Sequence, residues 1–274
     1  MERGSESSVA VFMPTARCGQ WLDAAILSVI HQTYTPTDLY VVDDAAGDVD
    51  AGLISRYPSV NFLRMKTAAG PYTIANLLLR QTRSAFVAFH DADDTSHPQR
   101  LQSQISFLDD FDGCGSWVVN VDADGEALGY DTFPTRASDY LDQDRLFALL
   151  HPSSLFRRAV LDALGGFDGG TRFGADTEFL YRCALRFNIG NVQRFLYRHT
   201  IHPASLTQAR DTGFASEARK LYDDALRQNI EAIRAGTQPQ PAQGQLLNGK
   251  SAGLLSADGF EVMQLAPGNT TWKR

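Results

Sequence analysis

The chain has 274 residues, 43% of them hydrophobic and 21% charged, which is the composition of an ordinary globular protein with a sizeable core. Its formal net charge of −7 argues against nucleic-acid binding, because nucleic-acid binders carry a basic patch or stripe. The three cysteines are scattered and lack metal-binding spacing, which argues against a disulfide framework or a zinc site and predicts a reducing environment.

The ends of the chain and its hydropathy predict where it works. No apolar run approaches the roughly 18 residues of a membrane-spanning helix. Segment 1–8 is polar and lacks the apolar core of a signal peptide, so we expect a flexible N-terminus. We therefore expect no transmembrane segment and a cytoplasmic location, and we leave peripheral association with the inner face of the membrane open.

The first half of the chain alternates short apolar runs with amphipathic segments. The apolar runs fit strands that are buried on both faces, as in a parallel sheet. We predict strands at 9–13, 38–42, 60–64 and 84–90, and helices at about 21–29, 49–57, 74–82 and 98–111. This repeated strand–helix order predicts an α/β domain with a largely parallel sheet flanked by helices.

Polar residues follow three of these strands at their carboxyl ends. They are Pro14-Thr15, Asp43-Asp44 and Asp91-Ala92-Asp93. Ligands of open α/β sheets bind at the carboxyl ends of the strands, so we expect these residues to converge on one crevice. For Asp43 and Asp44 an Asx turn is the alternative, since the turn segment 45–48 follows them directly.

The segment 91–94 carries three carboxylates within four positions. Like charges this close repel, so either one protonates or a cation is bound. Mg²⁺ and Mn²⁺ prefer oxygen ligands, and Mg²⁺ typically combines one or two carboxylates with substrate phosphates. The spacing of Asp91 and Asp93 therefore suggests a metal–diphosphate site. The alternative is an Asp-rich helix N-terminus ahead of Pro98.

The second half of the chain is predicted to form shorter strands and helices. A strand at 115–121 precedes Asp122-Ala123-Asp124-Gly125, which we interpret as a hairpin turn and not as a metal site. Residues 130–150 are irregular and become helical at 142–150. A short strand or loop at 151–156, a helix at 157–164 stopped by Gly165-Gly166, a helix at 175–187 and a short strand at 194–199 follow.

The C-terminal region changes in composition. A polar helix is predicted at 212–235, and its loose apolar stripe could pack on the domain or form a homodimer. From residue 236 the chain is rich in Gln, Pro, Gly and Ala, which predicts a linker or tail whose apolar patches could dock. We thus expect four parts: 1–8, a domain at 9–210, a helix at 211–235 and a tail at 236–274.

Short motifs in a fixed order carry a family resemblance over about residues 9–207. They are Val11-Phe12-Met13-Pro14-Thr15, Val41-Val42-Asp43-Asp44, Gly70 to Asn76, Phe89-His90-Asp91-Ala92-Asp93-Asp94 with Pro98, Ser154-Leu155-Phe156-Arg157-Arg158, Gly165-Gly166-Phe167-Asp168, Asp176-Thr177-Glu178-Phe179 with Arg182, and His202-Pro203-Ala204-Ser205-Leu206-Thr207. In these motifs the chain resembles family 2 glycosyltransferases of the GT-A fold. The resemblance implies inverting transfer of a sugar from a nucleoside diphosphate donor.

The resemblance also implies a donor pocket. Pro14 and Thr15 stand where the family's first loop touches the base, and Asp44 stands where a carboxylate meets the base, typically uracil. Gly70 and Asn76 lie in the segment that lines the nucleotide. We include Asp43, Ala92 and Arg17 among the predicted donor contacts. Arg17 is a departure, because the family commonly has Asn there, and it could contact phosphate or reshape the base pocket.

For the chemistry, the resemblance assigns Asp93 as a ligand of Mn²⁺ or Mg²⁺ and Asp91 as a ribose or sugar contact. Asp176 matches the family's general base. His202 matches a histidine that often contacts diphosphate or metal, and His199 is the competing candidate. Glycosyl transfer needs one metallated carboxylate site for the leaving diphosphate and one free carboxylate for the acceptor proton.

Two features around Asp176 stay open at this point. Ala175 replaces a Glu that the family often has beside the base. The alternative role of Asp176 is a carboxylate that stabilises a helix N-terminus. Glu178 is two positions further along the helix and cannot share its face, so we expect it to form a salt bridge or to contact the acceptor.

The sequence thus predicts a metal-dependent inverting glycosyltransferase that uses a nucleotide sugar, with a UDP-sugar favoured, and a carbohydrate or glycolipid acceptor. The alternative is a catalytically silent nucleotide-sugar-binding module that acts as an assembly partner. A sugar nucleotidyltransferase ranks last, because it would carry a Gly-rich, basic phosphate loop after the first strand. The sugar, the acceptor and the linkage do not follow from the sequence.

Overall fold

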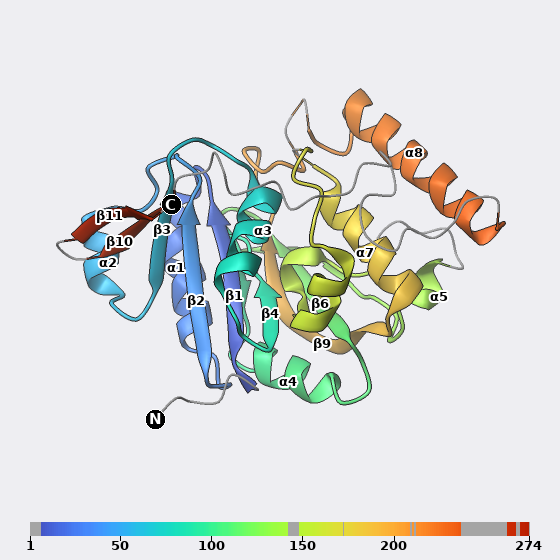
Figure 1. Cartoon of the computed structure of the whole chain (residues 1–274), viewed down its shortest axis with the longest axis horizontal. Coiled ribbons are helices and arrows are strands. Elements are labelled where there is room, and N and C mark those ends of the chain that lie inside the picture. Colours follow the sequence, from blue (N-terminus) through green and yellow to red (C-terminus); the bar gives the residue numbers. More distant parts are fainter. Residues whose placement is uncertain are drawn as a thin grey trace.

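The computed structural model of the chain describes residues 7–141, 148–171, 173–208, 210, 212–236, 262–266 and 269–273. Figure 1 shows a twisted sheet with helices on both faces, and α8 (Glu217–Arg234) at the outer side of α7 (Ala175–Arg186). Most of the helix predicted at 142–150 lies outside the described residues. No helix in the described ranges is long and apolar enough to cross a membrane.

The first half folds as the strand–helix alternation predicts. The strands β1, β2, β3 and β4 are Val9–Thr15, Thr37–Asp43, Asn61–Met65 and Phe86–Phe89, and the helices α1, α2, α3 and α4 are Gly19–Ile30, Ala51–Arg56, Pro71–Gln81 and Arg100–Phe107. These four strands lie side by side in the order β3-β2-β1-β4, and each pair is parallel. The predicted α/β class is therefore confirmed.

Both faces of the central sheet are buried, which explains the unbroken apolar runs. On β1, Ala10 and Phe12 belong to one core cluster, and Val9, Val11 and Met13 belong to the cluster on the opposite face. The first cluster is completed by α3, α6 (Arg158–Leu164) and α7, and the second by α1, α2 and α4. In Figure 1 α3 lies in front of the sheet and α1 behind it.

The second half adds strands of mixed direction. They are β5 (Thr95–Ser96), β6 (Gly113–Val121), β7 (Ala127–Asp131), β8 (Leu155–Arg157) and β9 (Ile189–Thr200), with α5 (Ser138–Leu141), a 3₁₀ turn at His151–Ser153, α6 (Arg158–Leu164) and α7 (Ala175–Arg186) between them. The sheet continues from β4 as β8-β6-β9-β5, with β7 paired to β6. β6 and β9 are parallel, whereas the other new pairs are antiparallel.

Several expectations for this half can be compared with the structure. Asp122 to Gly125 forms the hairpin turn between β6 and β7, as predicted, with the Gly125 N–H donating to the Asp122 carbonyl at 3.0 Å. α6 ends at Gly165, which takes a left-handed conformation (φ 73°). The strand predicted at 194–199 is shorter than β9, which spans Ile189–Thr200. β5 was not predicted, because a strand of two residues shows no alternation of apolar and polar side chains.

The C-terminal elements attach at two different places. α8 (Glu217–Arg234) packs on α7 through Leu226 and Ile230, which contact Tyr181. β10 (Val262–Ala266) and β11 (Asn269–Lys273) form an antiparallel pair, and β10 extends the sheet by pairing antiparallel with β3. These two strands fall inside the predicted tail and were not anticipated. The predicted division at residues 210 and 235 stays a prediction.

Candidate functional site

Several of the predicted site residues lie at the carboxyl edge of the parallel strands. Thr15 at the end of β1 is in register with Asp43 at the end of β2. The neighbouring strand β4 ends at Phe89 and leads directly into the acidic segment 91–94. This is the edge at which ligands of open α/β sheets bind.

The three carboxylates after β4 form a compact cluster. One oxygen each from Asp91, Asp93 and Asp94 lies within 4.8 Å of the others. The cluster is tied to β9: the Thr200 N–H donates to Asp94 Oδ1 at 2.7 Å, and the Asp91 N–H donates to the Tyr197 hydroxyl at 3.1 Å. The other oxygen of Asp94, Oδ2, is buried without a hydrogen-bond partner.

The cluster is electrostatically strained. Burial, together with the negative charges of Asp93 and Asp176, raises the pKa of Asp91 to about 8. Burial, together with Asp93 and Asp91, also holds the pKa of Asp94 well above its usual range. Carboxylates pushed toward their neutral forms in this way regain their charge when a cation is bound among them.

His202 is brought to this cluster from beyond β9. Its Nε2 lies 2.8 Å from Asp93 Oδ2, although the two residues are 109 positions apart. Its ring stacks on Trp21 of α1 with the centroids 4.2 Å apart and the planes at 28°. Nδ1 is buried and has no hydrogen-bond partner. His199, the competing candidate, lies 3.1 Å from Asn120 Oδ1 through its Nδ1.

The donor set fits a divalent cation. Carboxylate oxygens suit Mg²⁺ and Mn²⁺, and an imidazole nitrogen is a further ligand of the kind Mn²⁺ accepts. The unpartnered Asp94 Oδ2 is the kind of buried polar atom that a bound ion or its waters would satisfy. The structure thus brings Asp93 and His202, the two predicted metal ligands, into direct contact.

Asp176 lies in the first turn of α7, behind Gly174, which adopts a left-handed conformation (φ 79°). The hydroxyl of Tyr72 in α3 donates to Asp176 Oδ1 at 2.9 Å. The charge of Asp176 contributes to the raised pKa of Asp91, so the predicted base and the acidic cluster belong to one electrostatic site.

Glu178 does not face this site. Both of its carboxylate oxygens accept from the guanidinium of Arg182 at 2.8 Å, and each of the two side chains is 1% exposed. Arg182 also donates to the carbonyls of Leu164 and Gly166. Of the two expectations for Glu178, the structure supports the salt bridge. A substrate contact does not fit a carboxylate that is buried and paired in this way.

The predicted donor pocket contains one carboxylate that shapes a loop. Asp44 accepts from the backbone N–H groups of Ala69 and Gly70, at 2.6 and 2.9 Å. Thr15 donates from Oγ1 to Asp48 Oδ2 at 2.6 Å, so it holds the turn after β2. Arg17 is exposed and has a positive φ of 62°.

Pro14 and Ala92 lie at the same edge as these residues. Pro14 is the second-last residue of β1, where it pairs with Val42, and it is partly buried. The Ala92 side chain is 2% exposed. Ala92 packs into the core cluster beneath α1, so only its backbone is available to a ligand. The roles of these residues in donor binding stay predictions.

Two predicted donor contacts are structural instead. The carboxylate of Asp43 is fully buried and accepts from the N–H groups of Ala46, Gly47 and Val49 and from Arg64, which is the Asx-turn alternative. Asn76 is 3% exposed, and its amide bonds to both the N–H and the C=O of Phe167. The side chains of Asp43 and Asn76 are thus occupied inside the fold.

Three residues that the structure places around the site were not indicated by any motif. Trp21 stacks on His202, and Tyr72 donates to Asp176. The ring of His151 lies 4.4 Å from that of Phe89, its Nε2 is buried without a partner, and burial lowers its pKa to about 4. In the sequence, Trp21 and Tyr72 look like ordinary apolar positions of amphipathic helices.

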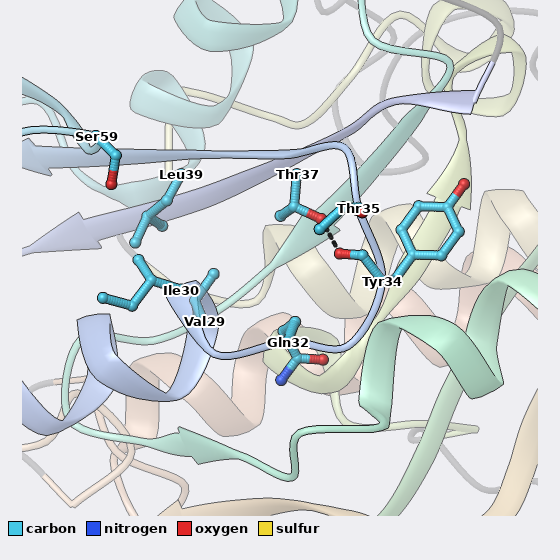
Figure 2. A pocket seen from close by; sticks show the side chains of 8 residues that line it. All are labelled: Val29, Ile30, Gln32, Tyr34, Thr35, Thr37, Leu39 and Ser59. Carbon is cyan, nitrogen blue, oxygen red and sulfur yellow. Dashed lines mark hydrogen bonds between the residues drawn. The ribbon is translucent and has the colours of Figure 1, made fainter.

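A small pocket elsewhere is distinct from this site. It has a volume of about 120 Å³ and lies between the C-terminal end of α1 and the amino end of β2, where Ile30, Tyr34 and Leu39 line it (Figure 2). The acidic cluster is at the opposite, carboxyl end of the same strands. We therefore assign no part of the predicted chemistry to the pocket in Figure 2.

Comparison with known families agrees with the architecture. The family model described as "Glycosyl transferase family 2" matches residues 10–165. This match covers more than half of the chain, and the chain belongs to this family. The resemblance noted from the motifs is therefore confirmed.

Curated relatives include several named glycosyltransferases. Poly(ribitol-phosphate) beta-N-acetylglucosaminyltransferase TarS of Staphylococcus aureus is 23% identical over 159 residues, which are 56% of this chain and 28% of TarS. The O-antigen biosynthesis glycosyltransferase WbnJ of Escherichia coli is 24% identical over 170 residues, 59% of this chain and 66% of WbnJ. The chain spans 28% to 42% of the length of TarS, EpsE of Bacillus subtilis and an uncharacterized glycosyltransferase of Haemophilus influenzae.

Solved structures show the same fold. The S. aureus TarS fragment 1-349 in complex with UDP-GlcNAc superposes with a TM-score of 0.62 at 17% identity, over 85% of this chain and 77% of that one. The mannosyltransferase PcManGT of Pyrobaculum calidifontis, in complex with GDP-Man and Mn²⁺, gives a TM-score of 0.58 at 17% identity, over 89% and 65%. The predicted GT-A architecture is confirmed by these neighbours and by the sheet described above.

Proposed function

We propose that the chain is a metal-dependent inverting glycosyltransferase that moves a sugar from a nucleoside diphosphate sugar to a hydroxyl group. Membership of family 2 supports the reaction class. A UDP-sugar is the favoured donor, because two TarS structures are complexes with UDP and with UDP-GlcNAc, although the PcManGT structure contains GDP-Man.

The observation that carries this proposal is the division of the site into two carboxylate groups. Asp91, Asp93 and Asp94 form a cluster with an adjoining imidazole nitrogen, a donor set that suits a divalent cation. Asp176 lies on another element, α7, and its carboxylate accepts a hydrogen bond from the hydroxyl of Tyr72. Sugar transfer to a hydroxyl group needs these two functions to be separate.

The acidic cluster would hold Mn²⁺ or Mg²⁺ through Asp93 and His202. When bound, the ion neutralises the charge that develops on the leaving diphosphate. Asp91 would contact the ribose or the sugar, and Asp44 would face the base. Trp21 keeps the His202 ring against Asp93, so that this nitrogen ligand is already in place when the donor arrives.

Asp176 would accept the proton of the acceptor hydroxyl as that oxygen attacks the anomeric carbon. Attack on the face opposite the leaving diphosphate inverts the configuration at that carbon. Positioning of a general base of this kind contributes about 10² to 10⁴ in rate. The acceptor that we propose is a carbohydrate or glycolipid hydroxyl. Peripheral contact with a membrane and a homodimer through α8 stay proposals.

The first experiment is a thermal-shift series with UDP, GDP, dTDP and CMP, each with and without Mn²⁺. A ligand at about 100 times its dissociation constant adds roughly 2.7 kcal/mol to the stability of the folded state. The melting temperature should then rise by several degrees for UDP, and only when Mn²⁺ is present. No shift with any nucleotide would contradict both donor binding and the metal site.

The second experiment separates an enzyme from the silent binding module. UDP-GlcNAc and Mn²⁺ are incubated with the protein, and released UDP is measured with water or simple sugars as acceptors. Asp176→Asn should lose this turnover about a hundredfold or more and keep Mn²⁺-dependent UDP binding. Binding without turnover in the unaltered protein would favour the silent module. Equal turnover in Asp176→Asn would refute the assignment of the base.

A further inference from the structure

The hydrogen bond between Tyr72 and Asp176 joins two elements that are far apart in the chain. Tyr72 lies in the first turn of α3 and Asp176 in the first turn of α7, 104 positions later. The phenol oxygen is 2.9 Å from Asp176 Oδ1. A hydrogen bond to a carboxylate is charge-assisted and stronger than one between neutral groups.

The phenol can act only as a donor to this carboxylate. Burial and the charge of Asp176 raise the pKa of Tyr72 well above its usual range, so the hydroxyl keeps its proton. A phenol has a single O–H, which is directed at Oδ1. Tyr72 therefore is not a second base beside Asp176, and its effect on a reaction would pass through Asp176.

The orientation of Tyr72 is fixed on both sides. Its ring packs against Phe167 with the centroids 6.0 Å apart and the planes at 26°. Behind it, Gly70 has φ 81° and Pro71 occupies the first turn of α3, so the backbone enters the helix in one defined way. A side chain held like this delivers its hydroxyl to one point with little loss of conformational entropy.

The same loop connects Tyr72 to the predicted base pocket. Asp44 accepts from the N–H groups of Ala69 and Gly70, the residues that lead into α3. The short segment 69–72 thus donates hydrogen bonds at its start to Asp44, which is predicted to face the nucleotide base. At its end it donates to Asp176, which is predicted to accept the proton. The loop keeps these two ends of the site in a fixed relation.

We infer that Tyr72 is a positioning residue for the general base. Its hydroxyl holds Oδ1 and so fixes the rotation of the carboxyl group, which directs Oδ2 toward the acceptor hydroxyl. This inference rests on the proposed function, because it takes Asp176 as the base. It adds a residue and a role that the motifs of the chain do not indicate.

The test compares Tyr72→Phe with Tyr57→Phe. Tyr57 is a matched control, because its hydroxyl donates to Asp23 Oδ1 at the same distance of 2.9 Å, and it joins the residue after α2 to α1. The assay is Mn²⁺-dependent release of UDP from UDP-GlcNAc. Tyr72→Phe should lower kcat by about ten- to a hundredfold, with KM and the Kd for UDP changed less than about twofold. Tyr57→Phe should leave all three unchanged.

Three outcomes of this comparison would overturn the inference. Unchanged kcat in Tyr72→Phe would show that the hydroxyl does not assist the base. A parallel loss of UDP binding and of melting temperature would show that it only supports the fold. A matching loss in Tyr57→Phe would point the same way, because any tyrosine–carboxylate bond would then give the effect.

A double-mutant cycle keeps this test separate from the test of the proposed function. If Tyr72 acts through Asp176, Tyr72→Phe should have no further effect on the residual turnover of Asp176→Asn. Additive losses would overturn the inference and leave Asp176 as the base. If Asp176→Asn alone retains full turnover, the proposed base is wrong, whatever Tyr72→Phe does.

Discussion

Two acidic groups follow neighbouring regions of the same sheet, and they differ in how their oxygens are used. After β2, Asp43, Asp44 and Asp48 accept from backbone N–H groups, and Asp43 also accepts from Arg64. After β4, Asp94 has a buried oxygen without a partner. The Asp93 carboxylate there lies against a histidine nitrogen.

The first group consists of carboxylates whose hydrogen bonds stabilise a loop. The second group consists of carboxylates that the fold does not fully pair and that we propose bind a cation. N–H donors around the first group satisfy its charge within the fold, so that removing a member should weaken folding. In the second group, burial and mutual repulsion raise the pKa values of Asp91 and Asp94. Such a group weakens the metal-free fold and becomes favourable only when a cation is bound.

The largest effect on stability is expected for Asp43→Ala. This change removes the acceptor of three backbone N–H groups and the partner of Arg64, so the free energy of unfolding should fall by about 3 kcal/mol. Urea unfolding measures it. Asp50→Ala, which removes only the N-cap of α2, is the control and should lose about 1 kcal/mol. A smaller loss for Asp43→Ala than for Asp50→Ala would break the comparison.

Asp93→Ala should show the opposite pattern. The Mn²⁺-dependent affinity for UDP should fall about a hundredfold, because a carboxylate ligand is lost. The metal-free protein should lose clearly less stability than Asp43→Ala does, because relief of repulsion offsets the lost contact with His202. Calorimetric titration with UDP and Mn²⁺ and a melting curve without Mn²⁺ measure the two effects. Asp124→Ala, in the exposed hairpin turn with the same Asp-x-Asp spacing, is the control. Unchanged Mn²⁺-dependent affinity in Asp93→Ala would rule out the metal assignment.

The raised pKa of Asp91 predicts a pH dependence of Mn²⁺ binding. With a pKa of about 8, Asp91 carries a proton in the metal-free protein below that pH, and a bound cation must displace it. Affinity should therefore weaken as pH falls below about 8, by up to about tenfold per pH unit for one proton, and level off above it. Titration of free Mn²⁺ by electron paramagnetic resonance measures this. A constant affinity between about pH 6 and 9 would contradict it.

The smallest effect is expected for Trp21→Ala. Loss of the stacked indole frees the His202 ring to rotate, which should weaken Mn²⁺-dependent UDP binding by about three- to tenfold. Trp21→Phe keeps an aromatic face and should recover most of that loss. Trp117→Phe, on β6, controls for removal of an indole elsewhere and should bind UDP and Mn²⁺ normally. Equal binding by Trp21→Ala and the unaltered protein would show that His202 needs no such support.

Much of the fold follows from local pattern. β1, β2 and β4 are buried on both faces, so their apolar runs could be found without knowing their neighbours. The pairing of β10 with β3 could not be found, since it joins segments about two hundred positions apart through backbone groups that leave no trace in the side-chain pattern. The predicted turn at 122–125 succeeded because Gly125 supplies the required positive φ.

Features of the candidate site could be predicted where the residues involved are close in sequence, and not where they come from distant segments. The spacing of Asp91 and Asp93 suggested a cation site, and the i,i+4 spacing of Glu178 and Arg182 agrees with their ion pair. Asn76 looked like a ligand contact because its true partner, Phe167, is 91 positions away. Tyr72 looked like a helix residue because Asp176 lies on another helix.

The hydrogen bond from Thr200 to Asp94 joins residues that leave the ribosome at different times during synthesis. The acidic cluster is synthesised more than a hundred residues before His202, and the segments meet only after β9 has paired with β6 and β5. A nascent chain that still lacks β9 exposes the acidic group without His202, the proposed nitrogen ligand. We therefore expect the cation site to be among the last features to mature, so that Mn²⁺ retention reports completed folding.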